Sequence, residues 1–177
     1  QVFCKSDDLN DIILPISFDE TKEASKMNIA TRLSALNFLD NGGAIGVFPG
    51  GTVSTAQNPF GVPMDPGWRS FTAKMITRSD AQVVPIFFEG HNSRLFQVAS
   101  HIHYNLRMGL LIKEFKSKVG NPVKIAIGNP LSDTAIKSRS GNPRILMDFL
   151  REETYKLSRT PLDNFNYGYE FESRYKI

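Results

Sequence analysis

A glycine-rich segment, GGAIGVFPGGTVS, spans residues 42–54. It contains a short apolar run that is followed by a turn with few large side chains. Gly50 and Gly51 precede two hydroxyl residues, Thr52 and Ser54, in this turn. Glycines let backbone N–H groups approach an anion or a developing oxyanion, which side chains would otherwise obstruct. A purely structural interpretation is that the glycines turn the chain after a strand. The segment by itself leaves both interpretations open.

The turn does not match a nucleotide-binding loop. Gly46 and Gly51 have the spacing of G-x-x-x-x-G-K-[ST], but Thr52 and Val53 stand where that pattern has lysine and a hydroxyl residue. Without the lysine ammonium group, the phosphate charge has no partner. The dinucleotide pattern G-x-G-x-x-G is absent, and no G-x-S-x-G elbow presents Ser54 as a nucleophile. The phosphate-loop pattern is therefore rejected, and nucleotide binding is left as a third possibility that a melting-temperature measurement with ATP would test.

Three histidines, His91, His101 and His103, are the first candidates for metal ligands. On a helix, His101 and His103 would point about 200 degrees apart, and no cysteine or carboxylate stands at a matching interval. Surface histidines are therefore favoured, and the sequence predicts no metal site. Cys4 is the single cysteine, which excludes an internal disulfide and fits a reducing compartment.

The composition is that of one globular domain. The chain has 177 residues, of which 41% are hydrophobic. Its 21 basic and 18 acidic residues give a formal net charge of +3, which is far from a nucleic-acid signature. No apolar run is long enough to span a bilayer, and no basic-then-apolar leader suggests secretion. Because the sequence begins at Gln1 rather than methionine, we expect a fragment or a processed product.

Apolar runs of strand length alternate with segments of helical spacing. The expected strands are residues 11–16, 44–48, 82–88 and 123–128. The expected helices are residues 17–41, 65–76, 92–118 (broken near Asn105) and 142–157, with start signals at Ser17–Glu20, Asp65-Pro66 and Asn142-Pro143. Apolar strands without alternation, separated by amphipathic helices, are typical of a parallel sheet covered on both faces. The predicted fold class is α/β, with a mostly parallel sheet and helices on both faces.

This fold class places the glycine turn at a ligand-binding edge. Ligands of parallel sheets bind outside the carboxyl ends of the strands, and the turn directly follows residues 44–48. The segment EGHNSRLF, residues 89–96, follows the next expected strand. Asn92 and Ser93 can cap the following helix, or Asn92, Ser93 and Arg94 can face the same cleft as the turn.

The tail contains the segment FNYGYEF, in which aromatic residues recur at a period of two. Phe165, Tyr167, Tyr169 and Phe171 alternate with smaller or polar residues. This pattern indicates an edge strand or an extended arm laid over the core, or alternatively an aromatic surface at a membrane interface. We therefore separate an aromatic tail, residues 161–177, from residues 1–160.

Four segments together resemble the glycerolipid acyltransferase superfamily, and most of all its hemolysin-like branch, which includes lyso-ornithine-lipid O-acyltransferases. They are VFPGGTVS (47–54), VVPIFFEGHNSRLFQ (83–97), LRMGLLIKEF (106–115) and VKIAIGNPL (123–131). The resemblance extends from about Ile12 to Leu131, with the motifs in the family's order and spacing. It implies a glycerol-3-phosphate acyltransferase-like fold, of which residues 1–160 would be the C-terminal part.

The resemblance also implies an acceptor site. The family's motif F-P-E-G-T-R-S corresponds to residues 48–54, and its V-P-[VI] motif to residues 84–86. The implied substrate-binding residues are Phe48, Pro49, Gly50, Gly51, Thr52, Ser54 and Pro85, and we add Asn92, Ser93 and Arg94. Gly50 replaces the family's glutamate and Val53 its arginine. Losing that arginine removes the fork that would hold a phosphate bidentately, so the expected acceptor is not a glycerol phosphate.

The family's catalytic dyad, H-x-x-x-x-D, has no counterpart in this chain. The fifth residue after each of the three histidines is phenylalanine, leucine or methionine, never aspartate. In the family the histidine acts as general base on the acceptor hydroxyl, and the aspartate orients its ring. We therefore expect no catalytic residue within residues 1–177 and place the dyad upstream of Gln1.

The resemblance implies transfer of an acyl chain from a thioester, carried by acyl carrier protein or coenzyme A, to a lyso-lipid. No bound cofactor and no metal are implied. The expected location is cytoplasmic, peripheral to the inner face of the membrane, with the membrane surface and acyl carrier protein as partners. The alternative is a non-catalytic lipid- or partner-binding domain of the same fold.

Overall fold

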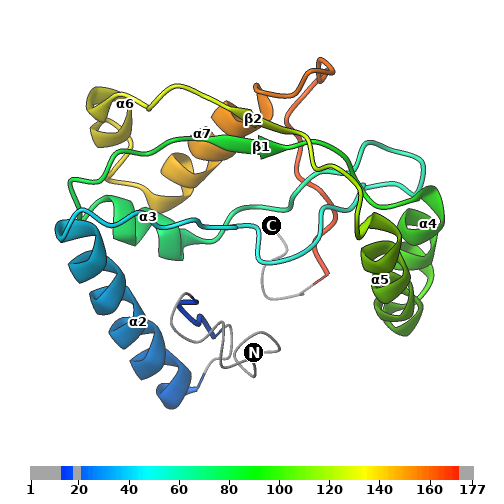
Figure 1. Cartoon of the computed structure of the whole chain (residues 1–177), viewed down its shortest axis with the longest axis horizontal. Helices are drawn as coiled ribbons and strands as arrows, with labels where there is room; N and C mark the ends of the chain where they lie inside the picture. The colour runs from blue at the N-terminus through cyan, green and yellow to red at the C-terminus, as the bar shows by residue number, and fades with distance from the viewer. Residues whose placement is uncertain (1–12, 18–20, 172–177) are drawn as a thin grey trace. The chain divides into compact units, whose positions relative to one another are not determined.

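The computed structural model describes residues 13–17 and 21–171. Figure 1 shows its helices and strands. The chain divides into two compact units. The first is formed by residues 1–47 and 74–81, and the second by residues 48–73 and 82–177.

Helix α2, Lys22–Asp40, is the main element of the first unit. Its N-cap is Thr21, whose hydroxyl accepts a hydrogen bond from the Ala24 N–H at 3.1 Å. The predicted start at Ser17 is wrong. The backbone of Ser17 instead exchanges two hydrogen bonds with the amide side chain of Asn28, of 2.9 and 2.7 Å. The cap therefore lies four residues later than the capping-box spacing predicts.

The predicted end of this helix is confirmed. Asn41 is the C-cap, and Gly42 follows with φ +80°, a conformation that glycine adopts without strain. Residues 13–16, part of the first expected strand, form no strand. The carbonyl of Pro15 instead accepts a hydrogen bond from the Thr31 hydroxyl at 2.8 Å. The remainder of that expected strand, residues 11–12, lies outside the described residues.

The second unit contains a two-stranded antiparallel ribbon. Strand β1, Ile86–Phe88, pairs with β2, Ile125–Ile127, with Phe87 opposite Ala126. Residues 44–48 form no strand. The mostly parallel sheet with helices on both faces stays a prediction. Both strands of the ribbon lie within segments that were expected to be strands, β1 within residues 82–88 and β2 within residues 123–128.

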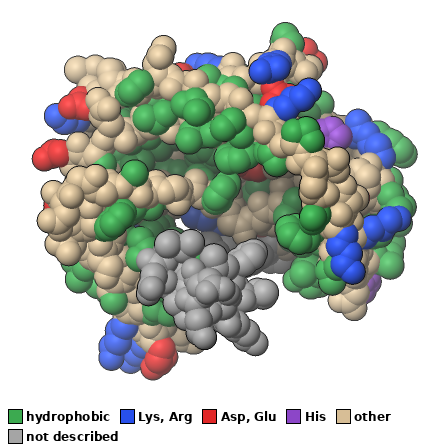
Figure 2. Space-filling model, viewed as in Figure 1, with side chains coloured by type: hydrophobic (Ala, Val, Ile, Leu, Met, Phe, Trp, Pro, Cys, Tyr) green, Lys and Arg blue, Asp and Glu red, His purple; other side chains and the backbone are tan. Residues whose placement is uncertain are grey.

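The two faces of the ribbon have different surroundings. Phe87 packs edge-on against the Tyr155 ring of α7, with 5.5 Å between the centroids. Side chains on the other face are exposed, namely Ile86, Phe88, Ile125 and Ile127. Figure 2 shows hydrophobic side chains gathered over this part of the second unit. One face of the ribbon is thus part of the core and the other is not.

Helices α4, Arg94–Ile102, and α5, Tyr104–Lys118, form a hairpin in the second unit. The helical conformation is interrupted at His103, which caps α5 by accepting a hydrogen bond from the Asn105 N–H at 3.1 Å. This confirms the predicted break near Asn105. Among residues 13–17 and 21–171, no helix is both long enough and apolar enough to cross a membrane.

Two more helices follow the ribbon. Helix α6, Asp133–Lys137, is short and was not expected from the sequence. Helix α7, Pro143–Tyr155, begins as predicted, because the Asn142 side chain accepts hydrogen bonds from the N–H groups of Arg144 and Ile145. The buried residues of α7 are Leu146, Met147, Leu150, Arg151 and Tyr155.

Helix α3, Ser70–Ile76, starts later than the proline signal predicts. The predicted cap, Asp65, does not cap a helix. Its carboxylate instead accepts a hydrogen bond from the Trp68 indole N–H at 3.0 Å and another from the Ser54 hydroxyl. These contacts hold residues 65–69 outside the helix.

The aromatic tail is held by a buried arginine. Arg151 is 1% exposed, and its guanidinium donates hydrogen bonds to the carbonyls of Phe165 (2.7 Å), Asn166 (2.9 Å) and Asp65 (2.9 Å). Next along the tail, the Gly168 N–H donates to the Asp65 carbonyl at 2.8 Å. The described part of the tail therefore lies along the loop that follows the glycine turn.

Candidate functional site

The two glycines of the turn differ in their backbone conformation and surroundings. Gly51 has φ +66°, and its N–H donates to the Phe48 carbonyl at 3.3 Å. This confirms the backbone freedom expected of Gly51. Gly50 does not have a positive φ, but it is buried, and a β-carbon there would lie 3.4 Å from the carboxyl carbon of Asp65. The turn therefore lies directly against an acidic side chain.

Asp65 connects the turn to α7. Besides its contact with Ser54, its backbone N–H donates to the Tyr155 hydroxyl at 2.8 Å. Burial, together with the nearby charge of Asp65, raises the pKa of Tyr155 to about 12. The Tyr155 phenol therefore keeps its proton at neutral pH. It can serve as a fixed hydrogen-bond partner beneath the turn.

A buried arginine lies on the α5 side of the same turn. Arg107 is 3% exposed. One of its terminal nitrogens, Nη1, donates to the hydroxyls of Thr55 (2.8 Å) and Ser100 (2.9 Å). The other, Nη2, donates to the Val53 carbonyl (3.2 Å) and the Thr52 hydroxyl (3.4 Å). The guanidinium thus binds three residues of the turn and its continuation, Thr52, Val53 and Thr55.

Arg107 is a buried cation without an acidic partner among residues 13–17 and 21–171. Its hydrogen-bond acceptors there are uncharged, and its guanidinium lies 4.8 Å from the Phe96 ring centroid and 4.0 Å from that of Phe171. Burial lowers the pKa of Arg107 to about 10, although Tyr104 partly offsets this. The group is still protonated at neutral pH, so it places a positive charge beneath the turn.

The turn also carries backbone donors. The N–H groups of Thr52, Val53 and Ser54 donate no hydrogen bond to any residue that the structure describes. The Thr52 side chain is exposed, and the Phe48 side chain at the start of the turn is 78% exposed. Backbone donors next to a buried cation favour a negatively charged group of a ligand or of a transition state.

Phe48 links the turn to the ribbon. Its ring lies 5.7 Å from the Phe88 ring of β1, between centroids. The neighbouring Pro49 contributes its carbonyl, which accepts a hydrogen bond from the Arg69 N–H at 2.9 Å. Pro85 is buried beside β1, and its carbonyl accepts from the Gly128 N–H at 2.9 Å. Pro85 therefore fixes the ribbon, and no hydrogen bond between it and the turn occurs among the described residues.

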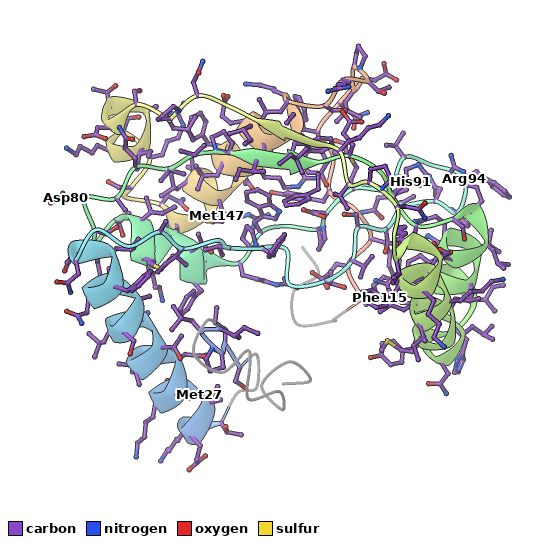
Figure 3. All side chains as sticks on the ribbon, in the orientation of Figure 1. Met27, Asp80, His91, Arg94, Phe115 and Met147 are labelled. Atoms are coloured by element: carbon purple, nitrogen blue, oxygen red, sulfur yellow. The ribbon has the colours of Figure 1, made fainter. Side chains whose placement is uncertain are left out.

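The second predicted group, Asn92 to Arg94, makes contacts elsewhere. Ser93 caps α4 by accepting from the Phe96 N–H at 3.3 Å, which confirms its capping role. Asn92 accepts a hydrogen bond from Lys118 at 2.6 Å, and Arg94 donates to the Gly61 carbonyl at 2.6 Å. Figure 3 shows Arg94 next to His91 at the start of α4. In the described part of the chain, no hydrogen bond joins these three side chains to the turn.

The three histidines contact neutral groups. His91 Nδ1 lies 2.9 Å from the Asn92 carbonyl, and His101 Nε2 lies 2.9 Å from the Ala56 carbonyl. His103 uses its Nδ1 to cap α5. Within residues 13–17 and 21–171, none of the three has a carboxylate hydrogen-bond partner of the kind that orients a catalytic base.

Sequence reasoning missed Asp65 and Arg107 as parts of this site. Asp65 carried a helix-start signal, which concealed its contact with a turn eleven residues earlier in the sequence. Arg107 interrupts the apolar run LRMGLLI, and a charged residue within such a run is a signal for a buried ion. That signal could have identified Arg107, but not the turn that it contacts.

Comparison with known proteins bears on what this site does. A family model described as acyltransferase matches residues 7–164 of the chain. That match includes the glycine turn, Asp65, Arg107 and both strands of the ribbon. Searches of curated proteins and of solved structures found no match.

Proposed function

The chain belongs to the acyltransferase family, and from this premise we propose that it serves the transfer of an acyl chain from a thioester to a lyso-lipid. The donor is carried on acyl carrier protein or coenzyme A, and no cofactor is bound. The hydroxyl or amine of the acceptor attacks the thioester carbonyl carbon, and the donor leaves as a thiol. Family membership supports acyl transfer in general, and the substrates are part of the proposal.

One observation carries the proposal, namely the position of Arg107 beneath the glycine turn. As the acceptor attacks, the thioester carbonyl oxygen gains negative charge, and donors aimed at that oxygen lower the barrier. The turn combines backbone N–H groups without described partners with a guanidinium that donates to Val53 and Thr52. Both features favour a negative charge at the turn.

The acceptor that we propose is not a glycerol phosphate. Val53 stands where the resembling enzymes have an arginine. Arg107 brings a guanidinium to the same turn, but both of its terminal nitrogens already donate to protein oxygens, and its side chain is buried. A buried guanidinium whose terminal nitrogens already donate hydrogen bonds cannot bind a phosphate bidentately. This supports an acceptor of the lyso-ornithine-lipid type, as in the hemolysin-like branch.

The general base is proposed to be none of the three histidines. Each contacts a neutral group, and neither sequence spacing nor a described hydrogen bond gives any of them an orienting aspartate. The same observation favours the second candidate, a non-catalytic lipid- or partner-binding domain. The two candidates differ in whether acyl transfer occurs in the complete encoded protein.

Location and fold complete the proposal. Because the acceptor is a membrane lipid, we propose action at the cytoplasmic face of the membrane, with acyl carrier protein as a possible partner. For the whole domain we retain the glycerol-3-phosphate acyltransferase-like α/β fold. In it, residues 1–160 would form the C-terminal part and residues 161–177 the aromatic tail.

The test compares the 177-residue chain with the complete encoded protein. Each is incubated with acyl carrier protein or coenzyme A thioesters and with lyso-ornithine lipid or lysophosphatidic acid. Thiol release and acylated product are followed, the product by mass. Because we propose that the general base lies outside residues 1–177, the 177-residue chain should be about 10²- to 10⁴-fold slower. The complete protein should acylate lyso-ornithine lipid in preference to lysophosphatidic acid.

Two results would contradict this proposal. Absence of transfer by the complete protein, with lyso-lipid binding intact, would favour the non-catalytic domain. Robust turnover by the 177-residue chain that is lost when His91, His101 and His103 are changed to alanine would place the base among them.

A further inference from the structure

Helix α5 carries an exposed apolar stripe. The α5 stripe consists of Tyr104, Met108, Ile112 and Phe115 of the helix, together with Val119, its C-cap. The successive spacings of four, four, three and four residues place these side chains on one face of the helix. All five are exposed, Ile112 at 62% and Phe115 at 72%. Figure 3 shows Phe115 on α5.

The α5 stripe is not the face that attaches α5 to its unit. That attachment uses Arg107, which is buried, and Glu114, whose carboxylate accepts a hydrogen bond from the Ser93 N–H at 3.0 Å. Five large apolar side chains in one exposed row are more than scattered surface residues, and such patches mark interaction sites. This row is therefore a candidate interaction surface.

Two lysines border the stripe, since Lys116 follows Ile112 by four residues and Lys118 follows Phe115 by three. Residues 104–118 include four basic residues (Arg107, Lys113, Lys116 and Lys118) and one acidic residue (Glu114), so the net charge is 4 − 1 = +3. Partial burial tends to raise the pKa of Glu114, but hydrogen bonds from Ser93 and the nearby Lys118 outweigh this and lower it. Lys113 and Lys116 are exposed. Hydrophobic and basic side chains lie beside one another over α4 and α5 in Figure 2.

We propose that the α5 stripe docks on the surface of an anionic lipid bilayer. An apolar helix face bordered by lysines lies in the membrane interface, with its apolar side chains among the acyl chains and its ammonium groups at the headgroups. The inference rests on the proposed function, because that function places the acceptor in a bilayer. It goes further by naming the surface and the charge of the lipid.

Charge argues against a second copy of the chain as the occupant. A two-fold dimer formed through the α5 stripe would bring the same patch of both copies together. Lys116 and Lys118, which border the stripe, would then be present twice at one interface, where like charges repel each other. An anionic bilayer satisfies the same lysines.

The test is sedimentation of the 177-residue chain with vesicles of phosphatidylcholine alone or with about 30% phosphatidylglycerol. Binding is expected only with phosphatidylglycerol and should weaken as salt is raised. Ile112→Asp and Phe115→Asp should each weaken binding at least about tenfold. The matched control is Ile145→Asp, at a residue of α7 that is 53% exposed, and it should bind like wild type.

A second experiment tests the contribution of the lysines with two double variants that change the net charge by the same amount. Lys113→Glu/Lys116→Glu should weaken binding at least about tenfold, whereas Lys137→Glu/Lys156→Glu, on other elements, should have little effect. Thermal unfolding of each variant checks that the fold is intact. Equal binding of the stripe variants and wild type, or no binding of wild type to anionic vesicles, would overturn the proposal. A dimer in solution that Ile112→Asp dissociates would assign the stripe to a second copy and overturn it too.

Vesicle binding is measured without donor or acceptor, so it is separate from acyl transfer. If the complete protein acylates detergent-dispersed lyso-lipid but the chain does not bind anionic vesicles, only the docking surface is wrong. If the chain binds vesicles through the stripe but the complete protein transfers no acyl group, only the proposed function is wrong.

Discussion

The Arg107 guanidinium donates a hydrogen bond to the Thr52 hydroxyl at 3.4 Å, which ties α5 to the glycine turn. The two residues are 55 positions apart in the sequence. Val53, next to Thr52, occupies the position of an arginine in the resembling enzymes. A cation from another element thus lies beneath the turn. Because it is buried, it acts on the turn through its charge and its hydrogen bonds rather than by clamping a ligand.

Replacing Arg107 by methionine should destabilise the second unit. The variant loses four hydrogen bonds from the guanidinium and its contacts with two aromatic rings. We expect the free energy of unfolding in urea to fall by about 1–3 kcal/mol. Arg107→Lys should be intermediate, because a lysine keeps the charge but has no planar fork.

The control for that comparison is Arg139→Met. Arg139 also lies over an aromatic ring, 4.1 Å from the Phe149 centroid, but it is only half-buried. Its replacement should cost less than about 1 kcal/mol. If Arg107→Met is as stable as wild type, the cost of burying the charge equals the value of its contacts, which would contradict a stabilising role of Arg107.

Gly51→Ala and Gly50→Ala form a matched pair within the turn. Alanine at residue 51 would have to adopt φ +66°, which should cost about 1–2 kcal/mol of unfolding free energy. Alanine at residue 50 meets the Asp65 carboxyl carbon only at 3.4 Å, an ordinary contact, so Gly50→Ala should change stability by less than about 0.5 kcal/mol. Equal effects of the two substitutions would show that the backbone conformation of the turn is not as described.

Gly50→Asp should destabilise the chain in a pH-dependent way. The introduced carboxyl group would lie against Asp65, and repulsion would raise the pKa of the introduced group in the folded state. A raised folded-state pKa of an acid lowers stability as the pH rises through its unfolded value of about 4. Urea unfolding at pH 4 and pH 7, compared with Gly50→Ala, should show a deficit that is larger at pH 7. A deficit independent of pH would indicate a steric cause instead.

Tyr155→Phe should change the response of the protein to alkaline pH. The pKa of Tyr155 is raised to about 12 in the folded state, from 10.0. Its contribution to stability is therefore complete below pH 10 and is lost as the pH rises toward 12. At pH 7 the variant should be less stable by about 1–2 kcal/mol, because the Asp65 N–H loses its acceptor. The difference from wild type should shrink between pH 10 and pH 12, and a constant difference would contradict the assignment.

Local signals predicted the starts of two helices correctly. Asn142 caps α7 and Ser93 caps α4, as their sequence contexts indicate. The signal at Asp65 failed because the carboxylate binds Ser54 and Trp68 instead. Such contacts depend on tertiary structure, which a spacing rule does not contain.

The site could be predicted from the sequence only in part. The motif around Gly51 predicted a glycine turn. The φ of +66° at Gly51 agrees with that prediction. The tail could not be placed by its alternation of aromatic residues. Its position depends on Arg151, which binds the carbonyls of Phe165 and Asn166. The positions of Arg107 and Arg151 follow from packing in three dimensions, and neither has a local sequence rule.

The most direct test of the central claim is the kcat/KM of acyl transfer by the complete encoded protein carrying Arg107→Met, measured against Arg139→Met at a temperature at which both are folded. If the charge beneath the glycine turn stabilises the transition state, Arg107→Met should lower kcat/KM by about tenfold to a hundredfold. Arg107→Lys should recover part of the loss, and Arg139→Met should match wild type. Wild-type kcat/KM in the Arg107→Met variant, with its fold intact, would contradict the claim that this turn and its buried cation form the site of acyl transfer.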